Sequence, residues 1–600
     1  MQGYWQRRLT RRRVLAGSAG GTGLLALTIL GCGGDDSGGS GEKVTSRVTA
    51  PRNLTAEAKR GGIFQGMVAT DETTLDPLAS SRGGGAGGPA LPAYGRMLQE
   101  KPSIGTPVQK IEGDIAESWE LSADNLSLTM KIRADAKFDP RPPTNGRNVT
   151  AEDVVFSLNK FFAQSPYASQ LSYKVDPTSP VESVEAIDAR TVKYKLAFPW
   201  SPLLATMALG NHLIMPKEAD GGFDPKREIR GSSKWMLTEY QPSSVFKWRK
   251  NPNYWNKEYP FLEGYDTPII PEYATRVSQF RAKAIWDANA TFNLNAGDVI
   301  DMANSLPDAV LYAGITSPSI TSIAFGSKPG SPWFDQRMRQ AVSLSLDREA
   351  WALADSGGDL YGAAGIPFPL TISSNISSFW GDYWIDPTSS KMGEGAKFYK
   401  HDPAEAKKLV SAAGFPNGLD VPAQVASSTH ASPQVAEQLG NMMRDAGIKL
   451  SINVVDYNSV FLPKIWVPGA VKGDYDGLTF GNSGGSQGHI MSYLYIDWHT
   501  KGSFTAARRW DAGQDKIDQM IEKGLKEFDA QKQKQIVWDI QKELATYMSG
   551  VTYTYGRAPF TMAWPWVQNY NVYQTTAGSS YGPQGGAGYD FIWYDESKKG

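Results

Sequence analysis

The 600-residue chain has a single cysteine, Cys32, so an internal disulfide framework is impossible. It has only five histidines, and no two of them have the i, i+4 spacing of a zinc-binding helix. An excess of one charge is also lacking, because 61 basic and 62 acidic residues give a formal net charge of −1. No global field would therefore steer the protein to nucleic acid or to an anionic surface. We expect no metal site and no nucleic-acid partner.

Two short motifs typical of enzymes occur, but neither has the context that it needs. Gly83–Gly88 matches G-x-G-x-x-G without a preceding predicted strand, so a glycine-rich loop is favoured over a dinucleotide site. Gly578–Gly582 matches the nucleophile elbow, but every histidine precedes Ser580, which excludes the required order Ser, Asp, His. Asp497 and His499 are interpreted as a surface pair. We expect a binding protein without a cofactor, and an enzyme of another type stays an open alternative.

The cysteine stands at the end of a signal-like segment. The arginines of Arg11–Arg13 precede an apolar run from Val14 to Leu30, which is too short and too rich in glycine for a confident membrane span. Thr10–Leu15 resembles a twin-arginine export signal, and Ile29–Cys32 resembles a lipobox. These resemblances imply an exported lipoprotein of the cell envelope or periplasm, lipid-anchored to the membrane through Cys32.

Residues 114–162 are the best-specified stretch of the chain. Apolar and polar residues alternate from Leu126 to Arg133, which is the period of a half-buried strand. After a loop rich in Pro, Asn and Gly, Thr150 stands where a helix N-cap belongs, and Asp153 can complete a capping box. An apolar stripe from Val154 to Phe162 follows. The pattern predicts an α+β unit.

The same stretch carries a family resemblance. AESWELSADNLSLTMKIRADAKF, followed by VTAEDVVFSLNKFF, resembles the signature of the extracellular solute-binding proteins of family 5, which serve peptide- and nickel-type ABC importers. The resemblance implies an α/β fold of the periplasmic-binding-protein type II class, with two α/β lobes joined by a hinge and an extra α+β subdomain in the first lobe. The boundaries it implies are an export signal (1–31), a lipid anchor and flexible tether (32–58), lobe I (59–105, 215–325 and 552–600), the inserted subdomain (106–214) and lobe II (326–551).

Residues 326–551 also have local signals of an α/β lobe. Asp402 is a good N-cap before Pro403, and Gly414 ends the predicted helix. A second apolar stripe ends at Gly447 and passes into an alternating strand from Ile448 to Val454, which is the half-unit of an α/β lobe. The Gly/Pro-rich segment 325–335 resembles the crossover between the lobes and is predicted to be the hinge.

The segment that resembles the ligand site departs from the family pattern. Peptide-binding relatives usually hold the ligand's ammonium with an aspartate, but Gly485 falls at that place here, and no acidic residue occurs between Asp476 and Asp497. Small neutral polar groups replace it, which suits a neutral polar ligand. A loop that never touches ligand, and packing of Tyr167 within its own lobe, stay open. The resemblance implies four polar anchors (Asp71, Thr73, Asn482, Gln487) and three aromatic walls (Tyr167, Phe480, Tyr555).

Together these observations predict the solute-binding component of an ABC importer. It would capture a peptide-like or other small polar solute between two lobes by hinge closure and deliver it to a membrane permease. Its partners would be the ligand, an ABC permease in the cytoplasmic membrane and the membrane that holds its lipid anchor, and we expect a monomer. A neutral oligosaccharide as ligand, and a role as a non-transport sensor, remain alternatives.

Overall fold

The computed structural model describes most of the chain from Arg47 onward. The described residues are 47–599 except 73, 79–89, 105–109, 166, 290–291, 293, 314–318, 369, 427–431, 467–472, 483–487, 503–511, 557–559 and 576–587. The predicted signal, the tether up to residue 46, Cys32 and the two glycine motifs lie outside this part. Residues Ser46–Gly600 cluster as one compact unit.

Lobe I, as we use the name, consists of two four-stranded sheets and the elements that pack on them. One sheet has the order β1-β14-β22-β13 and the other β10-β11-β12-β2. Short strand pairs β4–β24 and β23–β25 add to it, and the pair β3–β5 leads into the inserted subdomain, because Leu98 and Ile111 pack in the subdomain core. The strands are β1 (Val48–Thr49), β2 (Ile63–Gln65), β3 (Leu98–Glu100), β4 (Ser103–Ile104), β5 (Ile111–Gly113), β10 (Trp235–Gln241), β11 (Val245–Lys250), β12 (Gly264–Pro268), β13 (Asp287–Ala288), β14 (Val310–Ala313), β22 (Phe560–Ala563), β23 (Val567–Gln568), β24 (Tyr573–Gln574) and β25 (Trp593–Tyr594), and the helices are α2 (Ala90–Ala93), α5 (Tyr273–Arg281), α6 (Ala296–Ser305) and α15 (Gly588–Phe591).

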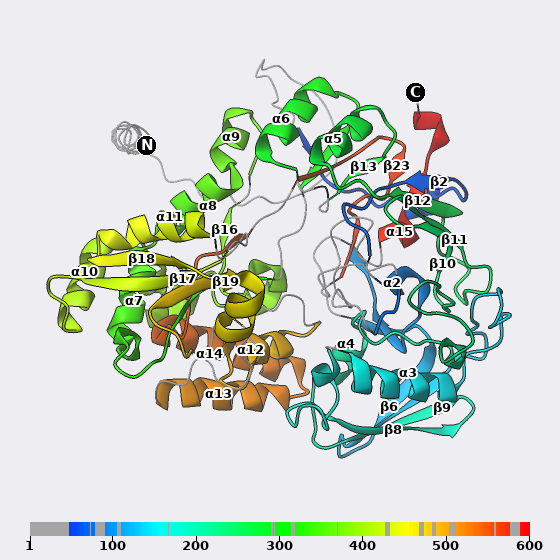
Figure 1. The fold of residues 1–600 in the computed structure, drawn as a ribbon, viewed down its shortest axis with the longest axis horizontal. Coiled ribbons are helices and arrows are strands. Elements are labelled where there is room, and N and C mark those ends of the chain that lie inside the picture. The colour runs from blue at the N-terminus through cyan, green and yellow to red at the C-terminus, as the bar shows by residue number, and fades with distance from the viewer. Residues whose placement is uncertain are drawn as a thin grey trace, which may run out of the picture. The chain divides into compact units, whose positions relative to one another are not determined.

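The inserted subdomain has an antiparallel sheet of order β6-β7-β9-β8 that α3 covers (Figure 1). Its elements are β6 (Ala116–Leu121), β7 (Ser127–Ile132), α3 (Ala151–Gln164), β8 (Val181–Asp188), β9 (Thr191–Leu196) and α4 (Leu203–Met207). The alternation read from the sequence is visible in β7, because Leu128, Met130 and Ile132 are buried whereas Thr129 and Lys131 are exposed.

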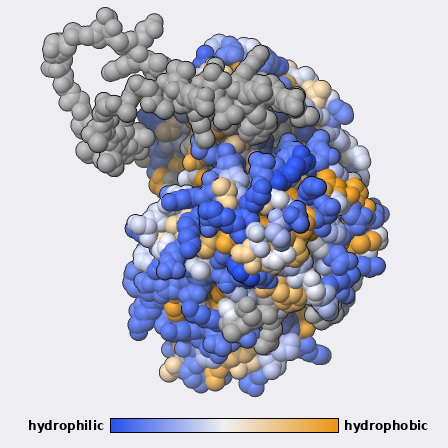
Figure 2. Space-filling model, turned by 90° about the vertical axis from the view of Figure 1, so that its left-hand side faces the viewer, coloured by the Kyte–Doolittle hydropathy of each residue, from blue (hydrophilic) through white to orange (hydrophobic). Residues whose placement is uncertain are grey.

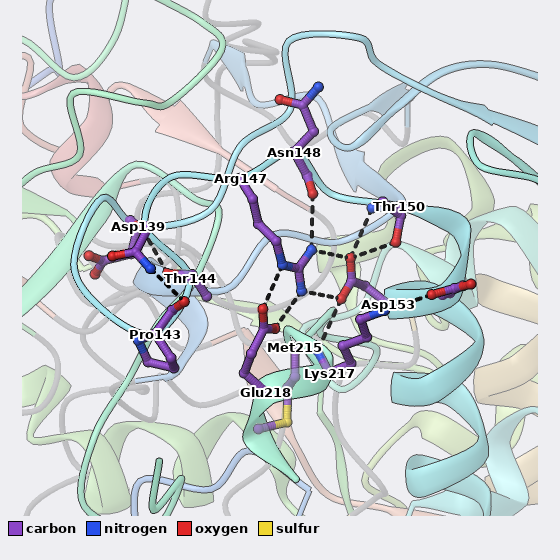
Figure 3. A network of polar contacts seen from close by, with 12 residues as sticks. Asp139, Pro143, Thr144, Arg147, Asn148, Thr150, Asp153, Met215, Lys217 and Glu218 are labelled. Atoms are coloured by element: carbon purple, nitrogen blue, oxygen red, sulfur yellow. Dashed lines mark hydrogen bonds and ion pairs between the residues drawn. The ribbon is translucent and has the colours of Figure 1, made fainter. Parts of the chain in front are cut away.

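A buried carboxylate organises the N-terminus of α3. Asp153 accepts hydrogen bonds from the backbone N–H of Thr150 at 2.9 Å and of Lys217 at 3.0 Å. The guanidinium of Arg147 lies between Asp153 and Glu218 and pairs with both (Figure 3). Although burial opposes it, these donors hold the pKa of Asp153 below its ordinary value. The cap predicted from Thr150 and Asp153 therefore also ties the subdomain to the segment that returns to lobe I.

Lobe II, as we use the name, has a five-stranded mixed sheet of order β18-β17-β19-β15-β20 with helices packed against it. Asp402 caps α10 by accepting from the N–H of Glu405, and Gly414 and Gly447, both at positive φ, follow α10 and α11. The strands are β15 (Thr321–Phe325), β17 (Leu419–Val425), β18 (Ile448–Val454), β19 (Leu478–Asn482) and β20 (Val551–Thr552), and the helices are α7 (Gln336–Ser345), α8 (Arg348–Ser356), α10 (Pro403–Ala412), α11 (Pro433–Arg444), α12 (Ile490–Trp498), α13 (Ala512–Leu525) and α14 (Ala530–Tyr547).

The strand β15 corrects the predicted lobe boundary. Residues 321–325 were expected to end lobe I, but β15 pairs with both β19 and β20 in the sheet of lobe II. The segment after it was predicted to be the hinge, yet Gly326 and Ser327 donate hydrogen bonds to the backbone oxygens of Gly477 and Gly473, inside lobe II. A Cβ on Gly326 would lie 2.0 Å from the backbone oxygen of Tyr475, so a close backbone approach explains this glycine.

The face that Figure 2 shows is mostly hydrophilic, with small hydrophobic groups between. Within the described residues, no helix combines the length and the apolar character that crossing a membrane requires.

Candidate functional site

Among the residues that the structure describes, two short elements join lobe I to lobe II. Strand β16 (Thr371–Ile372) pairs antiparallel with β21 (Tyr555–Gly556), so an outgoing and a returning segment run side by side. Helix α8 packs Trp351 into the core of lobe II, whereas the next helix, α9 (Gly358–Ala363), packs Tyr361 into the core of lobe I. Within the described residues the lobes therefore connect at β16–β21 and at the α8–α9 turn, and the chain also passes from β14 to β15 between Ala313 and Thr321. The predicted hinge segment 325–335 instead begins inside the sheet of lobe II.

The α8–α9 turn depends on Gly357. This residue has φ +70°, and a Cβ placed on it would lie 2.7 Å from Cβ of Ala296 at the start of α6. A glycine is needed here for its backbone conformation and for the close approach of lobe I. The turn is thus a short connection between the core of lobe II, where α8 packs, and the core of lobe I, where α9 packs.

Tyr555, predicted as a wall of the ligand site, lies at this connection. Its ring is packed into the core of lobe II with 5% exposure, and its hydroxyl donates to Asp355 Oδ2 on α8 at 2.7 Å. The side chain therefore links the β16–β21 pair to α8. In this structure the Tyr555 side chain stabilises the connection between the lobes and does not line an exposed surface.

Asp71, predicted as a polar anchor, is held on lobe I by three neutral donors. Its carboxylate accepts from the hydroxyl of Tyr240 at 2.8 Å, from the N–H of Ser243 at 2.6 Å and from the N–H of Glu72 at 2.8 Å. Tyr240 stacks on Phe246, and burial together with the bond to Asp71 raises the pKa of its phenol to about 12. Asp71 is half-buried, and none of these partners neutralises its charge.

Tyr167 joins the subdomain to lobe I. It precedes the 3-10 turn Ala168–Gln170 and is half-buried against the core of lobe I. Burial raises the pKa of its phenol. Gln170, at the end of the turn, accepts a hydrogen bond from Asn211 Nδ2 at 2.9 Å. The Tyr167 side chain is thus partly accessible and fixed in position.

The structure removes Phe480 from the predicted site. Its side chain has 0% exposure and packs edge-to-face on Tyr553 in the core of lobe II. Strand β19 lies inside the sheet, and Thr479 beside Phe480 is buried too, so both faces of the strand are covered. Asn482 ends this strand opposite Thr321. The side chain of Asn482, and Thr73 and Gln487, lie outside what the structure describes.

Among the described residues, no cluster of histidine, cysteine and acidic side chains could hold a metal ion. Asp497 and His499 were interpreted as a surface pair, but both are buried, and Nε2 of His499 lies 3.3 Å from Glu522 Oε1. The sequence analysis did not predict α12, so it gave no indication that these two side chains are buried. His489 instead caps α12 by accepting from the N–H of Met491, and burial lowers its pKa to about 4.

Comparison with known proteins gives one family and one fold. Residues 110–505 match the family model described as "Bacterial extracellular solute-binding proteins, family 5 Middle". The chain is 24% identical to the di/tripeptide-binding protein 2 of Pseudomonas aeruginosa over 408 residues, 64% of this chain and 70% of that protein. Its fold is similar to that of the ABC transporter-associated periplasmic binding protein DppA from Helicobacter pylori in complex with the peptide STSA (TM-score 0.65, 19% identity, 91% of this chain and 100% of that one). It is also similar to AgaA from A. tumefaciens R10 in complex with agropinic acid (TM-score 0.65, 20% identity, 89% of this chain and 99% of that one).

Proposed function

Because the chain belongs to the family 5 of bacterial extracellular solute-binding proteins, we propose that it captures its solute between lobe I and lobe II by closure about the β16–β21 connection and the Gly357 turn. It is the binding component of an ABC importer for peptides or related small solutes, and not an enzyme. The observation that carries the proposal is the extent of the family match, which runs over residues 110–505 and covers the subdomain, the α8–α9 turn, β16 and α12.

For the solute we propose a small polar molecule held mainly by neutral groups. The absence of any acidic residue between Asp476 and Asp497 supports neutral contacts from the segment 482–487. A buried ammonium without a partner would be costly. In lobe I, the described groups that donate to the Asp71 carboxylate are the Tyr240 hydroxyl and two backbone N–H groups, all of them neutral. We therefore propose Asp71 as the group that receives a positive end of the solute, if it has one, and Tyr167 as a partly exposed wall.

We also propose that Cys32 carries a lipid anchor after export through the twin-arginine route. The Thr10–Leu15 and Ile29–Cys32 patterns support this. The tether was predicted to run over residues 32–58, but β1 (Val48–Thr49) pairs with β14 and Leu54 bonds to Asn569 in lobe I. We therefore propose that the shorter segment 32–46 tethers a monomeric binding protein to the membrane beside its permease.

A ligand panel tests the proposed solute class. Thermal unfolding of the protein is followed with Met-Leu, the peptide Ser-Thr-Ser-Ala, agropinic acid, mannopinic acid and maltotriose. A solute at a hundredfold excess over its Kd adds about 2.7 kcal/mol to the free energy of unfolding. We expect shifts with peptides or with the two acids. A shift with maltotriose alone would establish the oligosaccharide alternative, and no shift at all would contradict the proposed class.

Asp71→Asn tests the anchor. The amide keeps an acceptor for Tyr240 but removes the charge, so the shift caused by an ammonium-bearing peptide should fall while that of a neutral solute stays. Asp220→Asn, at an exposed aspartate of lobe I, is the matched control. Equal shifts in both variants would rule out Asp71 as the anchor.

A further inference from the structure

The subdomain touches lobe II at a place far from the lobe connections. Just before α4, the backbone N–H of Ser201 donates to the oxygen of Leu525 at 2.8 Å, and Gln533 Nε2 donates to Ser201 Oγ at 3.0 Å. The hydroxyl of Ser201 also faces the oxygen of Gly524 at 3.5 Å. Helix α4 packs into the subdomain core, whereas α13 and α14 pack into a core of lobe II. Figure 1 shows α4 beside these helices.

Two further contacts extend this interface along α12. A Cβ on Gly488 would lie 3.0 Å from the backbone oxygen of Ala205 and from the side chain of Leu209, so lobe II approaches the subdomain closely there. On α12 itself, which begins two residues after Gly488, Tyr495 lies near Thr178 of the subdomain. Burial is the main reason why the pKa of the Tyr495 phenol is raised to about 12.

The amide of Gln533 is positioned for this contact by lobe II itself. It is 5% exposed, and Nε2 also donates to the oxygens of Gly524 at 3.1 Å and Glu527 at 2.9 Å. An amide has two hydrogens for these three acceptors. When Ser201 moves away, Gln533 still donates to the carbonyl oxygens of Gly524 and Glu527. Separation of the subdomain from lobe II therefore breaks the contacts between them without disturbing lobe II.

We infer that Ser201 and Gln533 form a clasp, made when the lobes close, that sets the population of the closed form. The subdomain belongs to lobe I, and lobe I joins lobe II through β16–β21 and the α8–α9 turn. Opening about these connections must break the Ser201 contacts. Apparent affinity scales with the fraction of molecules in the competent form. The clasp thus determines affinity without touching the solute; it rests on the solute-binding function but not on the solute class.

Two measurements on the full chain test the clasp without a known ligand. Hydrogen exchange reports protection of the Ser201 amide, and small-angle scattering reports the radius of gyration. We compare wild type, Ser201→Ala, Gln533→Ala and the double variant. Gln535→Ala is the matched control, because Gln535 lies on the same helix and its side chain donates to Asp539 in an exposed pair. We expect faster exchange and a larger radius in the clasp variants and wild-type values in the control.

A steric variant avoids any loss of lobe II stability through Gln533. Gly488→Ala places a methyl group against Ala205 and should open the clasp. Gly393→Ala is its control, because Gly393 has φ +67°, close to the +66° of Gly488, but has no heavy atom within 4 Å of the added Cβ. An unprotected Ser201 amide in the wild type, or clasp variants equal to wild type in both readouts, would overturn the inference.

Affinity provides the functional readout, with Met-Leu as the probe. Loss of one or two hydrogen bonds from the closed form should weaken binding about two- to tenfold, with Gln535→Ala unchanged. If no solute of the panel binds the wild type, the proposed solute class is wrong. If scattering and hydrogen exchange do not change in the clasp variants, the proposed clasp is wrong.

Discussion

Replacement of Asp287 by asparagine should change how the stability of lobe I depends on pH. Asp287 lies on β13 with 0% exposure. Tyr570 donates to its Oδ2 at 3.1 Å and Asn289 at 3.0 Å, whereas Oδ1 has no partner among the described residues. Burial, against the effect of these two hydrogen bonds, raises the pKa of the carboxyl to about 7 from its ordinary 3.8.

The sign and the size of this pH dependence follow from the linkage between proton binding and folding. Because the folded state holds this proton more tightly than the unfolded state, stability falls as pH rises from about 4 to about 7. One pKa unit corresponds to about 1.4 kcal/mol, so a rise of about three units costs about 4 kcal/mol above pH 7 and nothing below pH 4. Asparagine has no proton to lose and keeps an acceptor for Tyr570. Asp287→Asn should therefore be more stable than wild type at pH 8, but not at pH 4.

The assay is the free energy of unfolding of both proteins at pH 4, 6 and 8, by denaturant titration. Taking the difference between them cancels every other titrating group. Asp220→Asn at an exposed site is the control, and its difference from wild type should not vary with pH. A difference between Asp287→Asn and wild type that is the same at all three values would refute the reasoning, because the carboxyl would then titrate alike in both states.

Three further substitutions test packing and pairing. Arg147→Ala should lower the free energy of unfolding by about 3–5 kcal/mol, since it leaves the buried carboxylate of Asp153 without its cation; a loss under about 1 kcal/mol in denaturant titration would contradict this. Gly477→Ala should abolish soluble expression, because its Cβ would lie 1.8 Å from the backbone oxygen of Pro422 at φ +76°; a folded variant by circular dichroism would disprove it. Phe480→Ala should cost about 3–5 kcal/mol of stability yet leave solute affinity per folded molecule unchanged by calorimetry, and a selective loss of affinity would return Phe480 to the site.

The sequence predicted correctly those features that depend on residues close together in the chain. Asp402, Pro403 and Gly447 act within one turn of their own helices, so α10 and α11 were found with their ends. Phe480 was misplaced because the resemblance that implied it as a wall of the site does not show that its strand lies inside a sheet with both faces covered. The prediction of a hinge at Gly326 is wrong because the sequence alone does not distinguish a glycine needed for a close backbone approach from a glycine needed for movement.

The pairs that build the candidate site were beyond the reach of local reasoning. Asp71 meets Tyr240 across 169 positions, and Ser201 meets Gln533 across 332. No spacing or periodicity couples residues so far apart, and only the fold brings them together.

The place of β22 has a consequence for how the protein is made. This strand, Phe560–Ala563, stands between β14 and β13, and the later ion pair of Asp590 with Lys234 fastens the C-terminal helix to β10. The subdomain needs only neighbouring chain and can fold while the ribosome is still working, since folding proceeds unit by unit during synthesis. The lobe I sheet that holds β13 and β14 cannot be completed until β22 has been synthesised. A nascent chain stalled or truncated before β22 exposes two unpaired strand edges, which makes it a target for chaperones and proteases.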